Sequence, residues 1–393
     1  MPPKRQMALY LGSVVCMSVA VGINDSIFNN FLADTFRLTA DARGWLEFPR
    51  EFPGLMVVVM TGVLCMLPVT RVGMVGALGL AGGLLGLGLF GTEFLPMLAM
   101  MLLASAGLHL LQPVGASIIL ALSSENNRGR RMGQASAIGT IGVVIGTGGV
   151  WLFFDKTHPV YANAFFIAAL IAALGGIFYM LMHIPHLHQP RSRMVYRKEF
   201  RLYYLLEFLF GARKQIFITF GPWALIKIYG LPASSIAGLL MLAAFIGIIF
   251  KPLAGMVIDW LGERFVMVFD GIVLCMVCLG YGYAKQLTGD ADTARLIACV
   301  CFVLDDLLFA LGNARSVYLS RMTASHQELN ASLAVGVSIN HIASMSIPAV
   351  AGALWVGFGY ERVFLAAAVF ALFCALVSTR VPGKQPSALS AAA

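Results

Sequence analysis

Twelve long apolar segments constrain this chain more than any other feature of its sequence. A helix needs about 20 apolar residues to cross the ~30 Å hydrocarbon layer of a bilayer. The chain is 59% hydrophobic and 12% charged, whereas a soluble domain carries about 25% charged residues. The sequence therefore predicts an all-α integral membrane protein with twelve transmembrane helices at about 8–32, 44–68, 72–92, 95–122, 132–155, 160–183, 201–229, 234–258, 263–284, 293–321, 328–357 and 361–380.

Basic side chains lie unevenly on the two sides of these segments. The predicted inner side holds Arg128, Arg130 and Arg131 as well as all four Lys and Arg residues of the segment 184–200. Because Lys and Arg concentrate in cytoplasmic loops, both termini are expected in the cytoplasm. Topology and anionic lipid then account for the formal net charge of +8, so we expect lipid contacts but no nucleic-acid partner. The first apolar run is too long for a signal peptide, and we expect a multi-pass protein of a bacterial-type cytoplasmic (inner) membrane.

The two halves of the chain repeat one another. Four residues of the first segment recur 189 positions later, and HLLQPVGASIILALS, from His109, resembles DLLFALGNARSVYLS, from Asp306. Such parallel repeats occur in one class of membrane transporters. The sequence thus predicts an N-terminal six-helix bundle at 1–183, a cytoplasmic central loop at 184–200, and a C-terminal six-helix bundle at 201–393 with a short disordered tail. The recurring residues are Gly22, Ile27, Phe28 and Phe31, matched by Gly211, Ile216, Phe217 and Phe220.

The segment GMVIDWLGER, residues 255–264, resembles the signature loop of the major facilitator superfamily, which joins two helices of one bundle. This resemblance implies two pseudo-symmetric six-helix bundles, secondary transport by alternating access, and a latch in which Asp259, Gly262 and Arg264 stabilise one conformation. The first copy of the loop has Thr70 in place of the acid, so whether a first latch exists stays open.

The fifth apolar segment contains the glycine-rich run GTIGVVIGTGG. The run is similar to a motif of the superfamily's proton-linked exporters, although Thr147 replaces the expected proline. Small residues at this spacing also allow close helix packing, and packing is the interpretation we favour.

Polar side chains inside the apolar segments mark the predicted solute site, because they are costly in a membrane and tend to be functional. Arg213 and Lys214 take the places that Asn24 and Asp25 hold in the first repeat. A guanidinium can bind a carboxylate or phosphate through two parallel hydrogen bonds, so we expect this pair to recognise an anion. Either the solute or an acid such as Asp25 or Asp305 has to complete the site. The remaining candidates for binding the solute are Asn24, Asn29, His109, Gln112, Asn313 and Asn340.

Acidic residues in the same segments are candidates for proton coupling. These are Asp25, Asp305 and Asp306. The last two point about 100° apart on a helix, so one is expected to face the cavity and the other to pair with a neighbouring helix. Asp306 and Asn313, seven residues apart, are expected on one helical face.

The run WLEFPREFPG holds a dense charged group near the predicted outer side. Glu47 and Glu51 are four residues apart, and Arg50 is adjacent to their shared face. An ion-paired gate and a self-neutralised structural cluster remain equal alternatives.

Together these features predict a monomeric secondary transporter for a small, polar, anionic solute, coupled to protons. We expect no cofactor, no metal site and no enzymatic activity, since the sequence offers no nucleophile with a base, no phosphate loop and no metal-ligand set. Two alternatives stay open: a proton-linked exporter of amphipathic compounds, and a non-transporting membrane sensor or scaffold with this fold.

Overall fold

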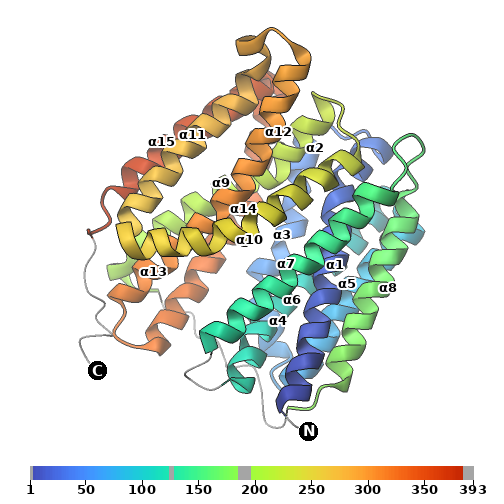
Figure 1. Cartoon of the computed structure of the whole chain (residues 1–393), viewed down its shortest axis with the longest axis vertical. Helices are drawn as coiled ribbons and strands as arrows, with labels where there is room; N and C mark the ends of the chain where they lie inside the picture. Colours follow the sequence, from blue (N-terminus) through green and yellow to red (C-terminus); the bar gives the residue numbers. More distant parts are fainter. Residues whose placement is uncertain (1–2, 124–127, 185–195, 384–393) are drawn as a thin grey trace. The chain divides into compact units, whose positions relative to one another are not determined.

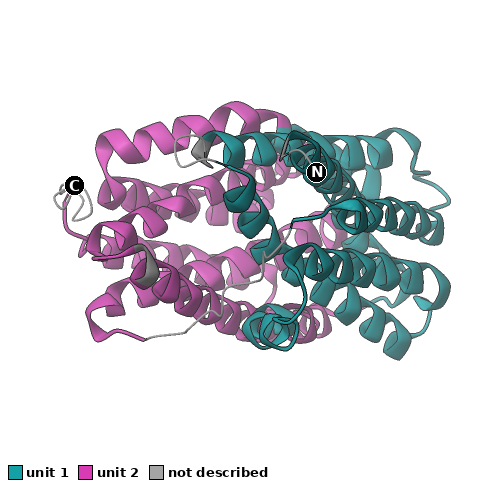
Figure 2. Cartoon of the chain, turned by 90° about the horizontal axis from the view of Figure 1, so that it is seen from below, with its two compact units in different colours: residues 1–37, 52–191, 231–244 teal, residues 38–51, 192–230, 245–393 magenta. Residues whose placement is uncertain are grey.

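The computed structural model describes residues 3–123, 128–184 and 196–383, whose regular elements are helices (Figure 1). The predicted central loop at 184–200 lies mostly outside the described residues, and so does the predicted tail. The described chain forms two compact units, drawn in different colours in Figure 2.

Unit 1 comprises residues 1–37, 52–191 and 231–244. Within it α1 packs against α7 and α8, and α5 packs against α6 and α8. Its helices are α1 (Pro3–Thr35), α4 (Val57–Val63), α5 (Val69–Phe90), α6 (Phe94–Leu122), α7 (Arg128–Phe153) and α8 (Tyr161–Leu181).

Unit 2 comprises residues 38–51, 192–230 and 245–393. Within it α9 packs against α14, α15 and α12, while α11 packs against α15 and α12. Its elements are α2 (Ala40–Trp45), η2 (Lys198–Phe200), α9 (Arg201–Lys227), α11 (Glu263–Thr288), α12 (Ala291–Leu308), η3 (Phe309–Gly312), α13 (Asn313–Met322), α14 (His326–Phe358) and α15 (Tyr360–Ser378).

Two helices are divided between the units. Residues 47–51 of α3 (Glu47–Leu55) belong to unit 2, whereas the start of α10 (Ala233–Leu261) belongs to unit 1. In unit 2 the short helix α2 packs on α14, so a segment from early in the chain lies with helices of its second half. The division into bundles at 1–183 and 201–393 stays a prediction.

In the described residues, nine helices are long and apolar enough to cross a membrane, namely α1, α5, α6, α7, α8, α10, α11, α14 and α15. The other three predicted spans depart from a simple apolar helix. The span at 44–68 is broken into short helices, with Pro53 inside α3. Helix α9 is continuous but carries three charged residues in its middle. The span at 293–321 is interrupted by the 3₁₀ turn η3, so the count of twelve spans is not confirmed.

Glycines bring helices of unit 1 into backbone contact. A Cβ atom at Gly142 or Gly146 on α7 would meet the carbonyl oxygens of Val15 or Val19 on α1. Conversely, a Cβ at Gly22 on α1 would meet the carbonyl oxygen of Val143. Small residues allow this approach where helices associate in a membrane, so the structure confirms the packing interpretation of the glycine-rich run.

The turn between α11 and α12 lies outside the membrane-spanning segments. Gly289 ends α11 with a φ of 65°, a left-handed conformation that glycine adopts without steric cost. Asp290 then caps α12 by accepting a hydrogen bond of 2.7 Å from the backbone N–H of Thr293. Hydrogen bonds from the side chain and backbone of Thr293 hold the pKa of Asp290 below its ordinary value.

Candidate functional site

Charged and polar side chains gather inside unit 2 around α9. A charge removed from water is stable only when it is paired or hydrogen-bonded, and α9 supplies partners to several helices. Three groups can be defined. The Glu47 cluster contains Arg43, Glu47, Arg50, Glu51, Gln215 and His341. The Arg213 cluster contains Arg213, Asp270 and Asp305. The Glu207 cluster contains Glu207, Arg315, Asn340 and Lys214.

Glu47 is the centre of the first cluster and is fully buried. Arg43 lies 2.5 Å from its Oε1 atom, and Arg50 donates from Nε to Oε2 over 2.7 Å. Gln215 on α9 donates from Nε2 to the same Oε2 over 2.5 Å. Sequence reasoning named Glu47 and Arg50 but missed Arg43 and Gln215. The spacing of four residues between Arg43 and Glu47 was the available signal.

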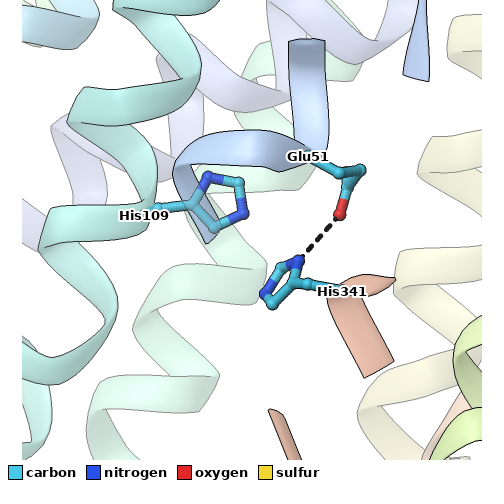
Figure 3. Close-up of side chains that lie close together, drawn as sticks. All are labelled: Glu51, His109 and His341. Atoms are coloured by element: carbon cyan, nitrogen blue, oxygen red, sulfur yellow. Dashed lines mark hydrogen bonds and ion pairs between the residues drawn. The ribbon is translucent and has the colours of Figure 1, made fainter. Parts of the chain in front are cut away.

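The same cluster reaches α14 through Glu51. Arg50 lies 3.4 Å from Glu51, and Nδ1 of His341 lies 3.1 Å from the other carboxylate oxygen. Figure 3 shows this second contact as a dashed line. The predicted charged group therefore extends beyond its own helix, because it joins residues 43–51 to both α9 and α14. A gating role for Glu47, Arg50 and Glu51 stays a prediction.

Arg213 lies at the centre of the second cluster, with 4% of its surface exposed. Its Nη1 donates to Oδ2 of Asp270 over 2.6 Å, and its Nη2 lies 3.9 Å from Oδ1 of Asp305. The guanidinium carbon is also 5.7 and 5.6 Å from the ring centroids of Phe210 and Phe309, within cation–π distance. An acid from another helix thus contacts Arg213. The sequence marks Asp270 as an acid inside an apolar segment, but sequence reasoning gave it no role at the site.

Lys214 faces a different helix from its neighbour. Consecutive residues point about 100° apart on a helix, and Nζ of Lys214 donates to Oδ1 of Asn340 on α14 over 3.2 Å. The amide nitrogen of Asn340 lies 3.4 Å from a carboxylate oxygen of Glu207. Glu207 in turn accepts from Nε of Arg315 over 2.9 Å. In the third cluster, the neutral amide of Asn340 therefore lies between the ammonium of Lys214 and the buried ion pair of Glu207 and Arg315.

Asp305 and Asp306 take different partners, as their angular separation predicts. Asp305 is buried toward Arg213, whereas Asp306 is half-buried and the charge of Lys251 acts on it. The expectation that Asp306 and Asn313 share one α-helical face stays a prediction. The turn η3 lies between them, and a 3₁₀ helix has about three residues per turn instead of 3.6. Asn313 is exposed.

The solute-binding and proton-coupling candidates from the first half of the chain lie in unit 1. Asn24 donates to Asp25 over 3.2 Å; Asp25 is exposed, and Asn24 and Asn29 are half-buried. On α6, His109 is buried with Nδ1 at 2.9 Å from the carbonyl oxygen of Ser105. Gln112, one turn further on, is exposed. The roles of these residues in binding and coupling stay predictions.

The signature loop joins α10 to α11 at Gly262, whose φ of 85° is unfavourable for other residues. Asp259 and Arg264, on either side, are exposed. The buried ion pair at this turn instead joins Glu263, 2% exposed, to Nε of Arg321 at the end of α13 over 2.5 Å. Sequence reasoning missed this pair, and the latch role of Asp259, Gly262 and Arg264 stays a prediction.

Comparisons with known proteins agree with this architecture. The nucleoside transporter NupG has a TM-score of 0.77 at 15% identity, over 96% of this chain and 98% of that chain. A D-xylose-proton symporter has a TM-score of 0.71 at 14% identity, over 98% of both chains. A POT family transporter in complex with 5-aminolevulinic acid has a TM-score of 0.75 at 12% identity, over 95% of both. At these identities the likeness shows the fold alone.

Sequence comparison supplies the family. No curated protein sequence matches the chain. The model of the Major Facilitator Superfamily, however, matches residues 10–323, which is most of the chain. The chain therefore belongs to the Major Facilitator Superfamily, and it is a multi-pass membrane protein of the transporter class, not an enzyme.

Proposed function

We propose that this protein is a proton-coupled secondary transporter that moves a small, polar, anionic solute by alternating access as a monomer in a bacterial-type inner membrane. Family membership supports transport of a small molecule. The similar structures named as a nucleoside transporter and a D-xylose-proton symporter support a polar solute. The buried charges of unit 2 support a polar site as well, because charge placed in hydrocarbon without a function is costly.

One observation carries the anionic part of this proposal. Of the two adjacent cations on α9, Arg213 contacts two carboxylates, whereas Lys214 donates to a neutral amide and is only half-buried. An ammonium has three N–H donors, and Asn340 accepts from one of them. We therefore assign recognition of the anionic group to Lys214 and Asn340, with Arg213 turned away from it.

Replacing Lys214 tests the assignment. We expect Lys214→Gln to weaken binding of an anionic solute by about 1.5–3 kcal/mol, the contribution of a hydrogen bond to a charged group. Lys214→Arg keeps the charge and should retain part of the affinity. A thermal-shift screen of organic anions, sugars and nucleosides identifies the ligand, since a ligand that binds the folded state raises the melting temperature. Equilibrium binding then gives the affinity of each variant.

The matched control is Lys156→Gln, which removes an exposed lysine outside the described helices. Its affinity should equal that of the parent protein. An anionic ligand bound equally well by Lys214→Gln would remove Lys214 from the site. A screen that finds only amphipathic ligands would favour the exporter alternative, and the absence of any transported ligand would favour the sensor or scaffold.

The contact of α2 with α14 supports a gate in the same unit. A Cβ atom at Gly44 would meet the carbonyl oxygen of Pro348, and a Cβ at Gly352 would meet the backbone of Ala40 and Asp41. The Glu47 cluster adds ion pairs and hydrogen bonds beside this backbone contact. We assign the pair of contacts to a gate that closes one side of the solute pathway and separates during transport.

Gly352→Leu tests the gate. The new side chain cannot fit against α2, and overpacking costs about 1–3 kcal/mol. Amide hydrogen exchange of residues 38–51 should therefore accelerate by roughly five- to 150-fold, because the local opening free energy falls by that amount. Gly357→Leu is the matched control on the same helix, since no atom lies within 4 Å of its Cβ position. Equal exchange in the two variants would contradict the gate.

A further inference from the structure

The Arg213 cluster contains more negative than positive charge. Asp270 and Asp305 both contact the single guanidinium of Arg213. Of the charged groups beside them, Arg315 pairs with Glu207, and the charge of Lys251 acts on Asp306. The Arg213 cluster, with two acids and one arginine, therefore carries one excess negative charge when both acids are ionised. Such a charge is strongly disfavoured in a protein interior.

Hydrogen bonding in the cluster is also incomplete. Arginine and carboxylate commonly form two parallel hydrogen bonds, yet Arg213 makes one, to Asp270. Four buried atoms have no hydrogen-bond partner, namely Nε and Nη2 of Arg213, Oδ1 of Asp270 and Oδ1 of Asp305. Native structures leave few buried polar atoms unsatisfied, and each one calls for an explanation. A proton on either free carboxylate oxygen would remove the excess charge and turn an acceptor into a donor.

Among the residues that the structure describes, Arg213 is the one cation that forms an ion pair with either acid. The aromatic rings of Phe210 and Phe309 cover the guanidinium. Arg315 acts on Asp270 but already pairs with Glu207. The other titratable groups that act on the cluster, from α11, α12 and α15, are Asp306, which adds negative charge beside Asp305, and the neutral side chains of Cys278, Tyr281, Cys301 and Cys374.

We propose that Asp270 and Asp305 share one exchangeable proton around Arg213. When the proton is bound, one acid is neutral and Arg213 pairs with the other. When it leaves, both carboxylates are charged and compete for the same guanidinium. The proton site thus occupies one face of α9, while the next residue, Lys214, faces α14 and Asn340. A role for this proton in driving solute movement rests on the transport function proposed above. The existence of the proton site does not depend on that function.

Infrared spectroscopy of the protein in lipid vesicles tests the site directly, because a protonated carboxyl group absorbs apart from a carboxylate. The difference between spectra recorded at low and high pH should contain one buried carboxyl band, lost with the release of one proton per protein. Asp270→Asn and Asp305→Asn should each abolish the band. Asp306→Asn and Asp25→Asn, which remove acids outside the cluster, should leave it in place.

Several results would overturn the proposal: a parent protein without the band, a band that survives in both Asp270→Asn and Asp305→Asn, or a band lost in Asp25→Asn. If an asparagine variant does not fold, Asp270→Glu and Asp305→Glu keep the carboxyl group and should shift the band and its pH midpoint. An unmoved band in both glutamate variants would also contradict the proposal. Because no transport is measured, a missing band rejects the proton site alone. A band in a protein that moves no solute rejects the transport function alone.

Discussion

Glu47→Gln is expected to lower the free energy of unfolding by about 3–5 kcal/mol, the cost of leaving a buried ion pair with one partner. Glu47 is fully buried and contacts Arg43, Arg50 and Gln215. Arg43 is only 1% exposed, so its charge cannot turn to water when the carboxylate is removed. Thermal or denaturant unfolding of the purified protein measures the change.

The control for Glu47 is an ion pair on the surface. Asp292 and Arg295 lie 2.8 Å apart, with side chains 82% and 53% exposed, and an exposed pair contributes about 0–1 kcal/mol. Asp292→Asn should therefore change stability little. Joint replacement of Arg43 and Glu47 by methionine should recover part of the loss, since it removes both buried charges. A Glu47→Gln variant as stable as Asp292→Asn would show that the cluster does not hold residues 43–51 to α9.

Arg213→Gln is the second change with a large expected effect. It leaves the buried Asp305 and the half-buried Asp270 without their guanidinium, and we expect a loss of about 3–5 kcal/mol in the free energy of unfolding. Adding Asp270→Asn should restore part of that loss, because one uncompensated carboxylate is removed with the cation. The coupling energy between the two substitutions, obtained from a double-mutant cycle, measures their interaction.

Arg362→Gln serves as the control for Arg213, because it removes an exposed arginine of unit 2 that has no assigned role. Its stability should match that of the parent protein. The alternative outcome is a stable Arg213→Gln variant that has lost affinity for an anionic solute. That result would support the prediction from sequence that Arg213 binds the solute together with Lys214. It would contradict a structural and proton-linked role for Arg213.

The chain's membrane helices could largely be read from hydropathy, because an apolar stretch of sufficient length satisfies its backbone hydrogen bonds in lipid only as a helix. The signature loop around Gly262 likewise indicated the family that the comparison confirms. The same reasoning did not resolve the breaks that separate α2, α3 and α4, or the one at η3, where short-range turns replace a regular helix. Hydropathy averages over a window and is insensitive to a change of helix type within it.

The sequence by itself determined which charged residues lie inside apolar segments, and so which residues have to find partners. Only the tertiary structure decided the partners. Arg213 and Asp270 are 57 residues apart, and Gln215 and Glu47 are 168 apart. Helical periodicity links residues three or four positions apart, whereas these contacts depend on which helix faces pack together. Adjacent Arg213 and Lys214 look equivalent in sequence, but the helix turns them toward different neighbours, and their surroundings then give them different chemistry.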